Sequence, residues 1–299
     1  MKHTAPTRLV VRAPAKINLT LCVGRRRSDN FHEIESFFQA IDLCDLVELE
    51  NASANGEVLV TTSDPALPCD ARNTAFRAAQ LLIEAWAPGR SVRIHLEKRI
   101  PSQAGLGGGS SDAAAVLRGL NRLWGLDLPP QALLSMAAAV GSDVPFFLTG
   151  GCAVVRGRGE VVQPFTPPFS GWVVLVKPDF GVSTAQAYAH LAAQRAGITP
   201  PHGEVMARMA RALSRGDVCA VARALHNDLE QPVFRAHPQL AALKDELEVA
   251  GALGALLSGS GSTVFGLFSS EAAARRAAEE LAGRWPWVAA VPTREADDE

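Results

Sequence analysis

The chain contains 299 residues, of which 29 are lysine or arginine and 31 are aspartate or glutamate, giving a formal net charge of −2. This balance argues against a broadly basic surface for nucleic acid or anionic membranes, although it leaves room for a local basic pocket. Glycine, proline and charged residues interrupt the apolar runs before the roughly 18 residues that a membrane span requires. The length suffices for two ordinary domains or for one large domain.

The five cysteines are scattered along the chain and form no C-x-x-C pair. Such a dispersed, odd-numbered set argues against a disulfide framework or a zinc site and for a reducing compartment. Residues 1–7 lack the apolar core that a signal peptide needs. We therefore expect a soluble cytoplasmic protein, with neither nucleic acid nor a membrane as partner.

The first strands are predicted from the alternation of polar and apolar residues. Residues 8–13 form one predicted strand, and from Lys16 onwards the alternation is strict, with Lys16, Asn18 and Thr20 on one face. A polar strand face is either a solvated edge or a surface turned towards a phosphate pocket. The pattern alone leaves both open.

Strands and a helix alternate over the next part of the chain. The arginine-rich segment 24–32 is predicted to be a solvated turn. Apolar periodicity then predicts strands within 33–49, at 58–62 and at 92–96, and a helix at 73–87.

A glycine-rich loop follows, in which residues 101–112 read PSQAGLGGGSSD before an apolar helical pattern that ends at Trp124. The glycines permit backbone conformations that are closed to other residues, and they leave N–H groups accessible. Ser110 and Ser111 are predicted to cap the following helix. A glycine loop that ends at a helix N-terminus is an anion-binding site, because unpaired N–H groups and the helix dipole act in the same direction.

Asp143 follows the next predicted helix, at 131–140, and stands between a Gly-Ser turn and an apolar Pro-Phe-Phe run. A carboxylate in this position is expected to be partly buried, either as a helix cap or with partners that compensate its burial. Residues 150–162 are predicted to form a glycine-turned hairpin.

The strongest candidate linker consists of Pro164, Pro167 and Pro168. It divides the chain into predicted domains at 1–163 and 164–299. The second is predicted to contain strands at 172–176 and 263–268 and helices at 183–195, 204–214, 220–225, 238–250 and 271–282. Because strands and helices alternate without a regular βαβ rhythm, an α+β fold is predicted rather than a doubly wound parallel sheet. The sequence assigns no role to three further features, Asn227, Asp228 and the Ser258–Ser262 loop.

The glycine loop fits none of three common phosphate-binding patterns. A Walker A loop requires Gly-Lys-Ser/Thr, but Gly109 is followed by Ser110 and the loop contains no lysine. A dinucleotide loop requires a third glycine where Ser110 stands, and an acidic residue about 20 positions later. A protein-kinase glycine loop lies in a hairpin and is not followed directly by a helix.

The loop does resemble the nucleotide loop of the GHMP kinases. Residues 13–19 (APAKINL) and 257–261 (LSGSG) resemble the first and third motifs of that superfamily. Residues 31–36 (FHEIES) and 141–147 (GSDVPFF) resemble segments of one branch, the 4-diphosphocytidyl-2-C-methyl-D-erythritol kinases. The matches follow the family's order between residues 13 and 265, so the resemblance covers nearly the whole chain.

The resemblance implies a two-domain GHMP kinase fold with the active site in the cleft between the domains. It implies ATP-dependent phosphorylation of the 2-hydroxyl of 4-diphosphocytidyl-2-C-methyl-D-erythritol, with Mg²⁺, on the non-mevalonate route to isoprenoid precursors. The enzyme is expected to be a monomer or a homodimer. The alternatives are another GHMP kinase activity, of homoserine or mevalonate type, and a non-catalytic nucleotide-binding protein on the same fold.

Roles for individual residues follow from the same resemblance. Asp143 would accept or orient the proton of the acceptor hydroxyl, and Lys16 would hold Asp143 ionised and steady the transferred phosphoryl group. The implied ATP-binding residues are Pro101, Gly105, Leu106, Gly107, Gly108, Gly109, Ser110, Ser111, Asn73 and Lys98. The implied substrate-binding residues are Asn18, Phe31, His32 and Tyr188.

Some of these positions have equally ordinary interpretations. Asn73 and Lys98 could be surface groups, and Tyr188 could be a core residue. Phe31 replaces the tyrosine of the family, which keeps a stacking face but loses a hydroxyl. Asp112 is expected to be an acid of the first helical turn, and no metal ligand is assigned.

Overall fold

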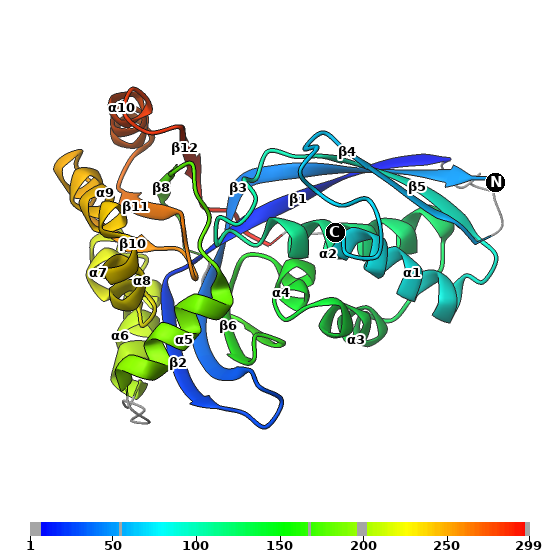
Figure 1. Ribbon diagram of the computed structural model, residues 1–299, viewed down its shortest axis with the longest axis horizontal. Helices are drawn as coiled ribbons and strands as arrows, with labels where there is room; N and C mark the ends of the chain where they lie inside the picture. Colours follow the sequence, from blue (N-terminus) through cyan, green and yellow to red (C-terminus); the bar gives the residue numbers. More distant parts are fainter. Residues whose placement is uncertain (1–6, 54–55, 167–168, 196–201, 297–299) are drawn as a thin grey trace. The chain divides into compact units, whose positions relative to one another are not determined.

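The computed structural model describes residues 7–53, 56–166, 169–195 and 202–296 (Figure 1). The chain forms two compact units, each assembled from segments that are not contiguous in sequence. The first comprises residues 1–15, 43–100 and 107–149, and the second comprises 16–42, 101–106 and 150–299. Strands β1 (Arg8–Asn18) and β3 (His32–Ala52) each contribute residues to both units.

The first unit is a sheet with helices packed on one side of it (Figure 1). Besides parts of β1 and β3, it contains β4 (Val58–Thr62) and β5 (Ser91–Glu97). Strand β5 pairs antiparallel with β3 and parallel with β4, and β1 pairs with β3. The helices are α1 (Thr74–Trp86), α2 (Gly108–Trp124), α3 (Pro130–Val140) and α4 (Val144–Thr149).

Helix α2 packs closely on this sheet through a glycine. A Cβ atom at Gly119 would overlap Cδ1 of Leu49 and would lie 2.9 Å from Cγ2 of Val11. A larger residue at this position would therefore push the side chains of Leu49 and Val11 aside. The helix ends at Gly125, whose φ of 57° lies in the left-handed region that glycine adopts at little cost. This packing anchors the helix whose first turn ends the glycine loop.

Part of the second unit is a group of paired strands. Strand β2 (Thr20–Arg26) pairs antiparallel with β3, which also pairs antiparallel with β6 (Cys152–Gly157). Strand β7 (Val161–Pro164) forms a hairpin with β6, and the two-residue β9 (His226–Asn227) pairs parallel with β2. The short β9 thus joins a distant part of the chain to the β2–β3 hairpin.

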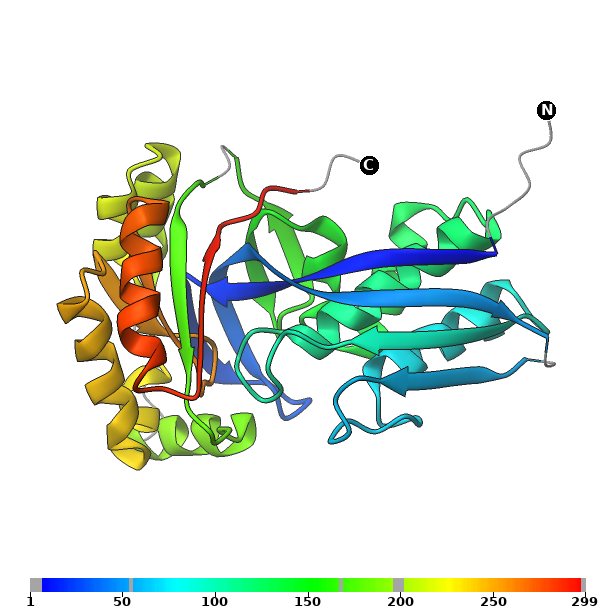
Figure 2. The same ribbon diagram turned by 90° about the horizontal axis from the view of Figure 1, so that it is seen from above.

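The same unit holds a second, fully antiparallel sheet in the order β10-β11-β8-β12. Its strands are Gly254–Leu257, Val264–Phe268, Trp172–Lys177 and Trp287–Pro292, in that order. Helices α7 (Val218–Ala224), α9 (Pro238–Val249) and α10 (Glu271–Ala282) pack on one side of this sheet (Figure 2). The remaining helices are α5 (Thr184–Arg195), α6 (Gly203–Ser214) and α8 (Glu230–Ala236).

The mixed α+β class predicted from the sequence is confirmed. The helices predicted at 73–87, 238–250 and 271–282 correspond to α1, α9 and α10, and the predicted hairpin is β6–β7. Five elements were not predicted, namely α4, α8, β9, β10 and β12. Each is short, and short apolar runs give no periodicity long enough to identify a helix or a strand. Among the described residues, no helix combines the length and apolar character needed to cross a membrane.

The burial of the polar strand face near the N-terminus excludes one of its two interpretations, a solvated edge and a surface turned towards a phosphate pocket. Leu19 separates strand β1 from strand β2, and its N–H donates to the carbonyl of Phe37 at 2.8 Å. Lys16, Asn18 and Thr20 are only 4%, 1% and 0% exposed. A solvated edge is therefore the wrong interpretation of this face.

The predicted linker is described only in part. Pro164 is the last residue of β7, whereas Pro167 and Pro168 lie outside the described residues. The predicted domain boundary between residues 163 and 164 stays a prediction.

Candidate active site

The glycine loop has the backbone that its sequence predicts. Gly105 and Gly107 have φ values of 73° and 75°, in the left-handed region. Gly107 is the N-cap of α2 and, as a glycine, has no side chain that could cap the helix. The prediction that Ser110 and Ser111 cap the helix is wrong, because both lie inside its first turns. Uncapped N–H groups at a helix start favour an anion.

A buried hydroxyl lies just behind this helix start. Ser111 is 1% exposed, and its Oγ has no hydrogen-bond partner among the described residues. A buried hydroxyl without a partner costs about 1–3 kcal/mol, so this position fits an oxygen-rich ligand that would supply one. Ser110, one residue earlier, is half-buried, and Gly109 is exposed.

A second Gly-Ser loop, Ser258–Ser262, closes on the first within the second unit. Ser258 Oγ donates to the carbonyl of Gly105 at 3.0 Å, and the N–H of Thr263 donates to that of Ala104 at 3.3 Å. From the other direction, the N–H of Lys16 donates to the carbonyl of Leu106 at 3.0 Å. The segment before the glycine loop is therefore held from two distant parts of the chain.

Asn227, for which no role was predicted, holds the Ser258–Ser262 loop. Its Nδ2 donates to the carbonyls of Leu257 at 2.8 Å and Gly259 at 2.7 Å, and its Oδ1 accepts from the N–H of Leu229 at 2.9 Å. Asn227 is 6% exposed, so these bonds are protected from solvent. No local sequence pattern reveals this role, because the two carbonyl partners lie 30 and 32 residues away.

Replacing Gly105 by alanine is expected to raise the KM for ATP. The new Cβ would overlap the carbonyl oxygen of Ser258 and lie 3.1 Å from that of Gly261, so the loops must move apart. The left-handed backbone adds about 1–2 kcal/mol of destabilisation for a residue with a Cβ. Steady-state kinetics and thermal unfolding would measure the two effects.

Gly89→Ala is the matched control for this substitution. Gly89 has a similar φ of 84°, but a Cβ there meets nothing within 4 Å. It should therefore lose similar stability without changing the KM for ATP. Equal KM values for both variants and the wild type would contradict the inferred fit between the loops.

Lys16 and Asn18 form a buried polar ladder. Lys16 Nζ donates to Asn18 Oδ1 at 2.6 Å and lies 4.6 Å from the ring centre of Phe38. Asn18 Nδ2 donates to Ser36 Oγ at 3.1 Å, and the Ser36 hydroxyl donates to the carbonyl of Thr20. The ladder fixes the directions of the lysine and the amide on this strand face.

Asp143 is half-buried and directly precedes α4. The predicted partial burial is thus confirmed. Asp143 belongs to the first compact unit and Lys16 to the second, so each is described within its own unit. Their predicted meeting at the acceptor hydroxyl stays a prediction.

The two rings expected to bind a cytosine lie together. The ring centres of His32 and Tyr188 are 5.3 Å apart, with planes inclined by 39°. His32 Nδ1 donates to the carbonyl of Gly24 at 3.2 Å, since the carbonyl only accepts, and this bond fixes the direction of the ring. Tyr188 is half-buried rather than a core residue.

Phe31 lies differently from its neighbour His32. Its ring is 48% exposed, with the guanidinium of Arg158 5.2 Å from the ring centre. The preceding Asn30 has a φ of 70°, a left-handed conformation that asparagine adopts more readily than most residues. The structure therefore gives Phe31 a free ring face near a cation, and its predicted contact with a base stays a prediction.

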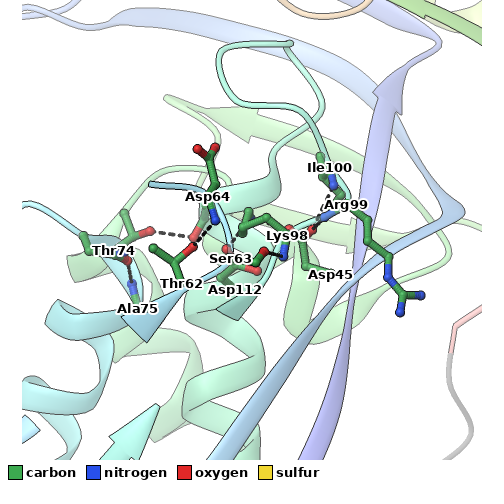
Figure 3. A network of polar contacts seen from close by, with 12 residues as sticks. Asp45, Thr62, Ser63, Asp64, Thr74, Ala75, Lys98, Arg99, Ile100 and Asp112 are labelled. Atoms are coloured by element: carbon green, nitrogen blue, oxygen red, sulfur yellow. Dashed lines mark hydrogen bonds and ion pairs between the residues drawn. The ribbon is translucent and has the colours of Figure 1, made fainter. Parts of the chain in front are cut away.

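Lys98 is the centre of a buried charge cluster, shown in Figure 3. Its side chain is 7% exposed, and Nζ contacts Oδ2 of Asp45 and, at 2.6 Å, Oδ2 of Asp112. Asp45 Oδ1 also accepts the N–H groups of Arg99 at 2.5 Å and Ile100 at 2.8 Å. The cluster ties the chain entering the glycine loop to the helix that leaves it.

These contacts correct two predictions. Lys98 is not a surface group, and Asp112 lies past the first turn of α2 as a buried ion-pair partner rather than a first-turn acid. Burial raises the pKa of Asp112, and Asp45 adds to the rise, while Lys98 opposes it. Burial lowers the pKa of Lys98, but Asp112 and Asp45 outweigh it, so the net pKa is raised. One lysine thus compensates two buried carboxyl groups.

Asn73 and Thr74 brace the same region from α1. Asn73 is the N-cap of α1, where Oδ1 accepts from the N–H of Ala75 at 2.9 Å and Nδ2 donates to the carbonyl of Pro68 at 2.8 Å. Asn73 is 8% exposed, so it is not a surface group, and its predicted contact with ATP stays a prediction. Thr74 Oγ1, which sequence reasoning missed, donates to the carbonyl of Gly109 at 2.6 Å (Figure 3).

No group of three or more His, Cys, Asp or Glu side chains that could hold a metal occurs in the part of the chain that the structure describes. Mg²⁺ in nucleotide sites is held mainly by phosphate oxygens, waters and one or two protein groups. The unpartnered Ser111 hydroxyl beside the glycine loop suits such a site, as an added oxygen near the phosphates. The residues present therefore fit a nucleotide-bound Mg²⁺ rather than a metal caged by the protein.

Comparison with known proteins identifies the family of the chain. Residues 73–151 match the GHMP kinases N terminal domain and residues 209–286 match the GHMP kinases C terminal family. Two relatives are named 4-diphosphocytidyl-2-C-methyl-D-erythritol kinase. One, from Shouchella clausii (strain KSM-K16), is 43% identical over 94% of this chain and 93% of its own. The other, from Synechococcus sp. (strain JA-3-3Ab), is 45% identical over 92% and 90%.

Solved structures agree as well. A crystal structure of 4-(cytidine 5'-diphospho)-2C-methyl-D-erythritol kinase has a TM-score of 0.80 and 38% identity, covering 95% of this chain and 99% of that one. A homoserine kinase from Cytophaga hutchinsonii has a TM-score of 0.77 at 22% identity, covering 99% and 97%, which shows the shared fold alone. The chain belongs to the GHMP kinases and, among them, to the family of 4-diphosphocytidyl-2-C-methyl-D-erythritol kinases.

Proposed function

We propose that this enzyme transfers the terminal phosphoryl group of ATP to the 2-hydroxyl of 4-diphosphocytidyl-2-C-methyl-D-erythritol. The reaction belongs to the non-mevalonate route to isoprenoid precursors. The observation that carries the substrate choice is the His32–Tyr188 pair, with ring centres 5.3 Å apart. A planar base can stack on an aromatic ring while the imidazole reads its edge by hydrogen bonding, which neither homoserine nor mevalonate offers.

ATP is the phosphoryl donor in this proposal, and the glycine loop binds it. The N–H groups from Gly107 to Ser110 provide donors for phosphate oxygens, and the start of α2 contributes its dipole. Pro101 and Leu106 shape the loop, and Leu106 is 1% exposed with its carbonyl held by Lys16. Asn73 and Lys98 lie on the α1 and β5 side of the same loop.

Mg²⁺, when bound, would neutralise the charge that develops on the phosphate oxygens. Ser110 and Ser111 are the residues of this chain placed to help hold it. Ser111 brings to that role a buried hydroxyl that lacks another partner among the described residues.

The chemical step needs little more than positioning and charge compensation. In the proposal, Asp143 accepts the proton of the 2-hydroxyl as its oxygen forms a bond to the transferred phosphorus and the bond to ADP breaks. Lys16 stabilises the charge on the transferred phosphoryl group. Asn18, whose Oδ1 accepts from Lys16 Nζ at 2.6 Å, contacts the substrate that receives the phosphoryl group. In the proposal, Phe31 also contacts the cytidine end of the substrate, together with His32 and Tyr188.

A coupled ADP-release assay tests the proposal. Purified enzyme would be offered ATP and Mg²⁺ with 4-diphosphocytidyl-2-C-methyl-D-erythritol, homoserine or mevalonate. We expect turnover only with the cytidine-linked substrate. Turnover of homoserine or mevalonate in its place would overturn the substrate assignment, and ATP binding without turnover of any of the three would overturn catalysis. The predicted cytoplasmic location stays a proposal, as does the oligomeric state. Gel filtration of the same preparation would distinguish a monomer from a homodimer.

A further inference from the structure

Asp228 has no role in the proposed reaction, but it contacts residues of three elements, β2, α5 and β9. Its side chain is 8% exposed. Oδ2 accepts the N–H of Val23 on β2 at 2.6 Å and lies 2.7 Å from Nη2 of Arg195 on α5. Oδ1 lies 2.9 Å from Nε2 of His226, in the neighbouring β9.

The carboxylate is well supplied with positive and N–H partners. Besides Val23, Arg195 and His226, Nε2 of His202 lies 2.9 Å from Oδ2. Burial raises the pKa of Asp228, but hydrogen bonds from His226, Val23 and Arg195 lower it more, to about 2. Asp228 is therefore an anion at neutral pH, and its hydrogen bond from the Arg195 guanidinium is of the strong, charge-assisted kind.

Asp228 joins α5 to β2: helix α5 carries Tyr188, and β2 holds His32, the first residue of β3, through a hydrogen bond. Arg195 lies seven residues after Tyr188 on α5, two helical turns and about 10 Å along the same face. Val23 directly precedes Gly24, whose carbonyl accepts from Nδ1 of His32. Arg195 Nη1 also donates to the carbonyl of Val23, so the guanidinium binds both the carboxylate and β2.

We propose that Asp228 and Arg195 form a clamp that sets the distance between Tyr188 and His32 and so determines affinity for the cytidine end of the substrate. The inference rests on the proposed function, because it takes a cytidine diphosphate group as the ligand of that pair. Both are positioning residues: they act through the rings and touch no reacting atom. Removing the ion pair should lower the affinity for cytidine, because a small displacement of one ring weakens both the stacking on the base and the hydrogen bond to its edge.

The variants are chosen to separate positioning from folding. Arg195→Gln is expected to raise the KM for the cytidine-linked substrate about 10-fold or more, the usual cost of losing a supporting partner. The kcat and the KM for ATP should stay at wild-type values, since the glycine loop is held by other residues. Arg195→Lys keeps the positive charge but not the bidentate geometry of the guanidinium, so it should restore part of the affinity for the cytidine-linked substrate.

Two comparisons sharpen the expected result. Arg211→Gln is the matched control, because Arg211 also pairs with a carboxylate, Glu204 at 2.7 Å, but is 57% exposed on α6. It should change neither KM. Asp228→Asn combined with Arg195→Gln should cost less than the sum of the two single changes, because both remove the same ion pair.

A direct readout of ring position exists, because Tyr188 is the only tyrosine of the chain. Enzyme labelled with 3-fluorotyrosine gives one ¹⁹F signal, which cytidine diphosphate should shift in the wild type. In Arg195→Gln the signal of the free protein should move, and more cytidine diphosphate should be needed to shift it. A purely structural role of the ion pair would lower the melting temperature and leave the titration unchanged.

The outcomes distinguish this inference from the function on which it rests. If the wild type binds cytidine diphosphate and Arg195→Gln binds it equally well, the clamp is wrong and the function stands. If Arg195→Gln lowers kcat and raises both KM values together, the clamp is likewise wrong. If the wild type neither binds cytidine diphosphate nor turns over the cytidine-linked substrate, the proposed function fails and the inference with it.

Discussion

Replacing Asp143 by asparagine is expected to lower kcat by about 10²–10⁴, the usual contribution of a general base, while the folded structure persists. Asparagine keeps the size of the side chain and an acceptor oxygen, but it cannot take up the proton of the acceptor hydroxyl at neutral pH. The KM values should change little, because the glycine loop and the aromatic pair are untouched. Steady-state kinetics with the cytidine-linked substrate would measure the loss.

Asp127→Asn provides the matched control for this change. Asp127 belongs to the same compact unit, but it is exposed in the turn after α2, where its φ is 46°. Asparagine tolerates that backbone, so kcat should equal that of the wild type. Near-wild-type turnover by folded Asp143→Asn would remove Asp143 from the proposed mechanism.

Replacing Lys98 by methionine is expected to lower the free energy of unfolding by about 3–5 kcal/mol, as when one partner of a buried ion cluster is lost. Asp45 and Asp112 would remain buried, at 0% and 2% exposure, without their cation. The folded state would then hold a proton on Asp112 more tightly than the unfolded state does. Stability should therefore fall as pH rises above about 4, the ordinary carboxyl pKa, which denaturant titrations at several pH values would measure.

Lys244→Met is the control, since it removes a lysine from a half-buried pair with Glu230 at 2.6 Å. Its cost should be about 1 kcal/mol or less, because solvent screens that pair. Lys98→Met combined with Asp112→Leu should recover part of the lost stability, because it removes one of the two carboxyl groups that Lys98 compensates. Equal stability of Lys98→Met and Lys244→Met would show that the cluster is not the tie inferred for the glycine loop.

The local features of the site were predictable from the sequence, because they depend on neighbouring residues. The positive φ angles of Gly105 and Gly107 follow from a glycine-rich run before a helical pattern. The partial burial of Asp143 follows from the apolar run beside it. The alternation around Lys16 correctly placed Lys16 and Asn18 on one face, although it could not say whether that face was buried.

The features that were missed or wrong depend on contacts between distant segments. Lys98 meets Asp45 from 53 residues away, so nothing near it in sequence marks it as buried. The serines after the glycine loop have the composition of helix caps, but packing of α2 starts the helix at Gly108, earlier than they predict. Asn227 and Asp228 had no role until the fold paired β9 with β2. Such pairings are set by tertiary packing, which single-sequence periodicity does not encode.

The contact between Ser258 and Gly105 has a consequence for synthesis of the enzyme. The two residues are 153 positions apart, so the ribosome makes the glycine loop long before it makes the loop that closes on it. At roughly 5–20 residues per second, the interval is about 8–30 s. A nascent chain that has passed residue 151, the end of the N-terminal family match, therefore still lacks the partner that completes its glycine loop. Productive nucleotide binding should accordingly be a late event, which keeps ATP from being captured by chains that have not yet finished.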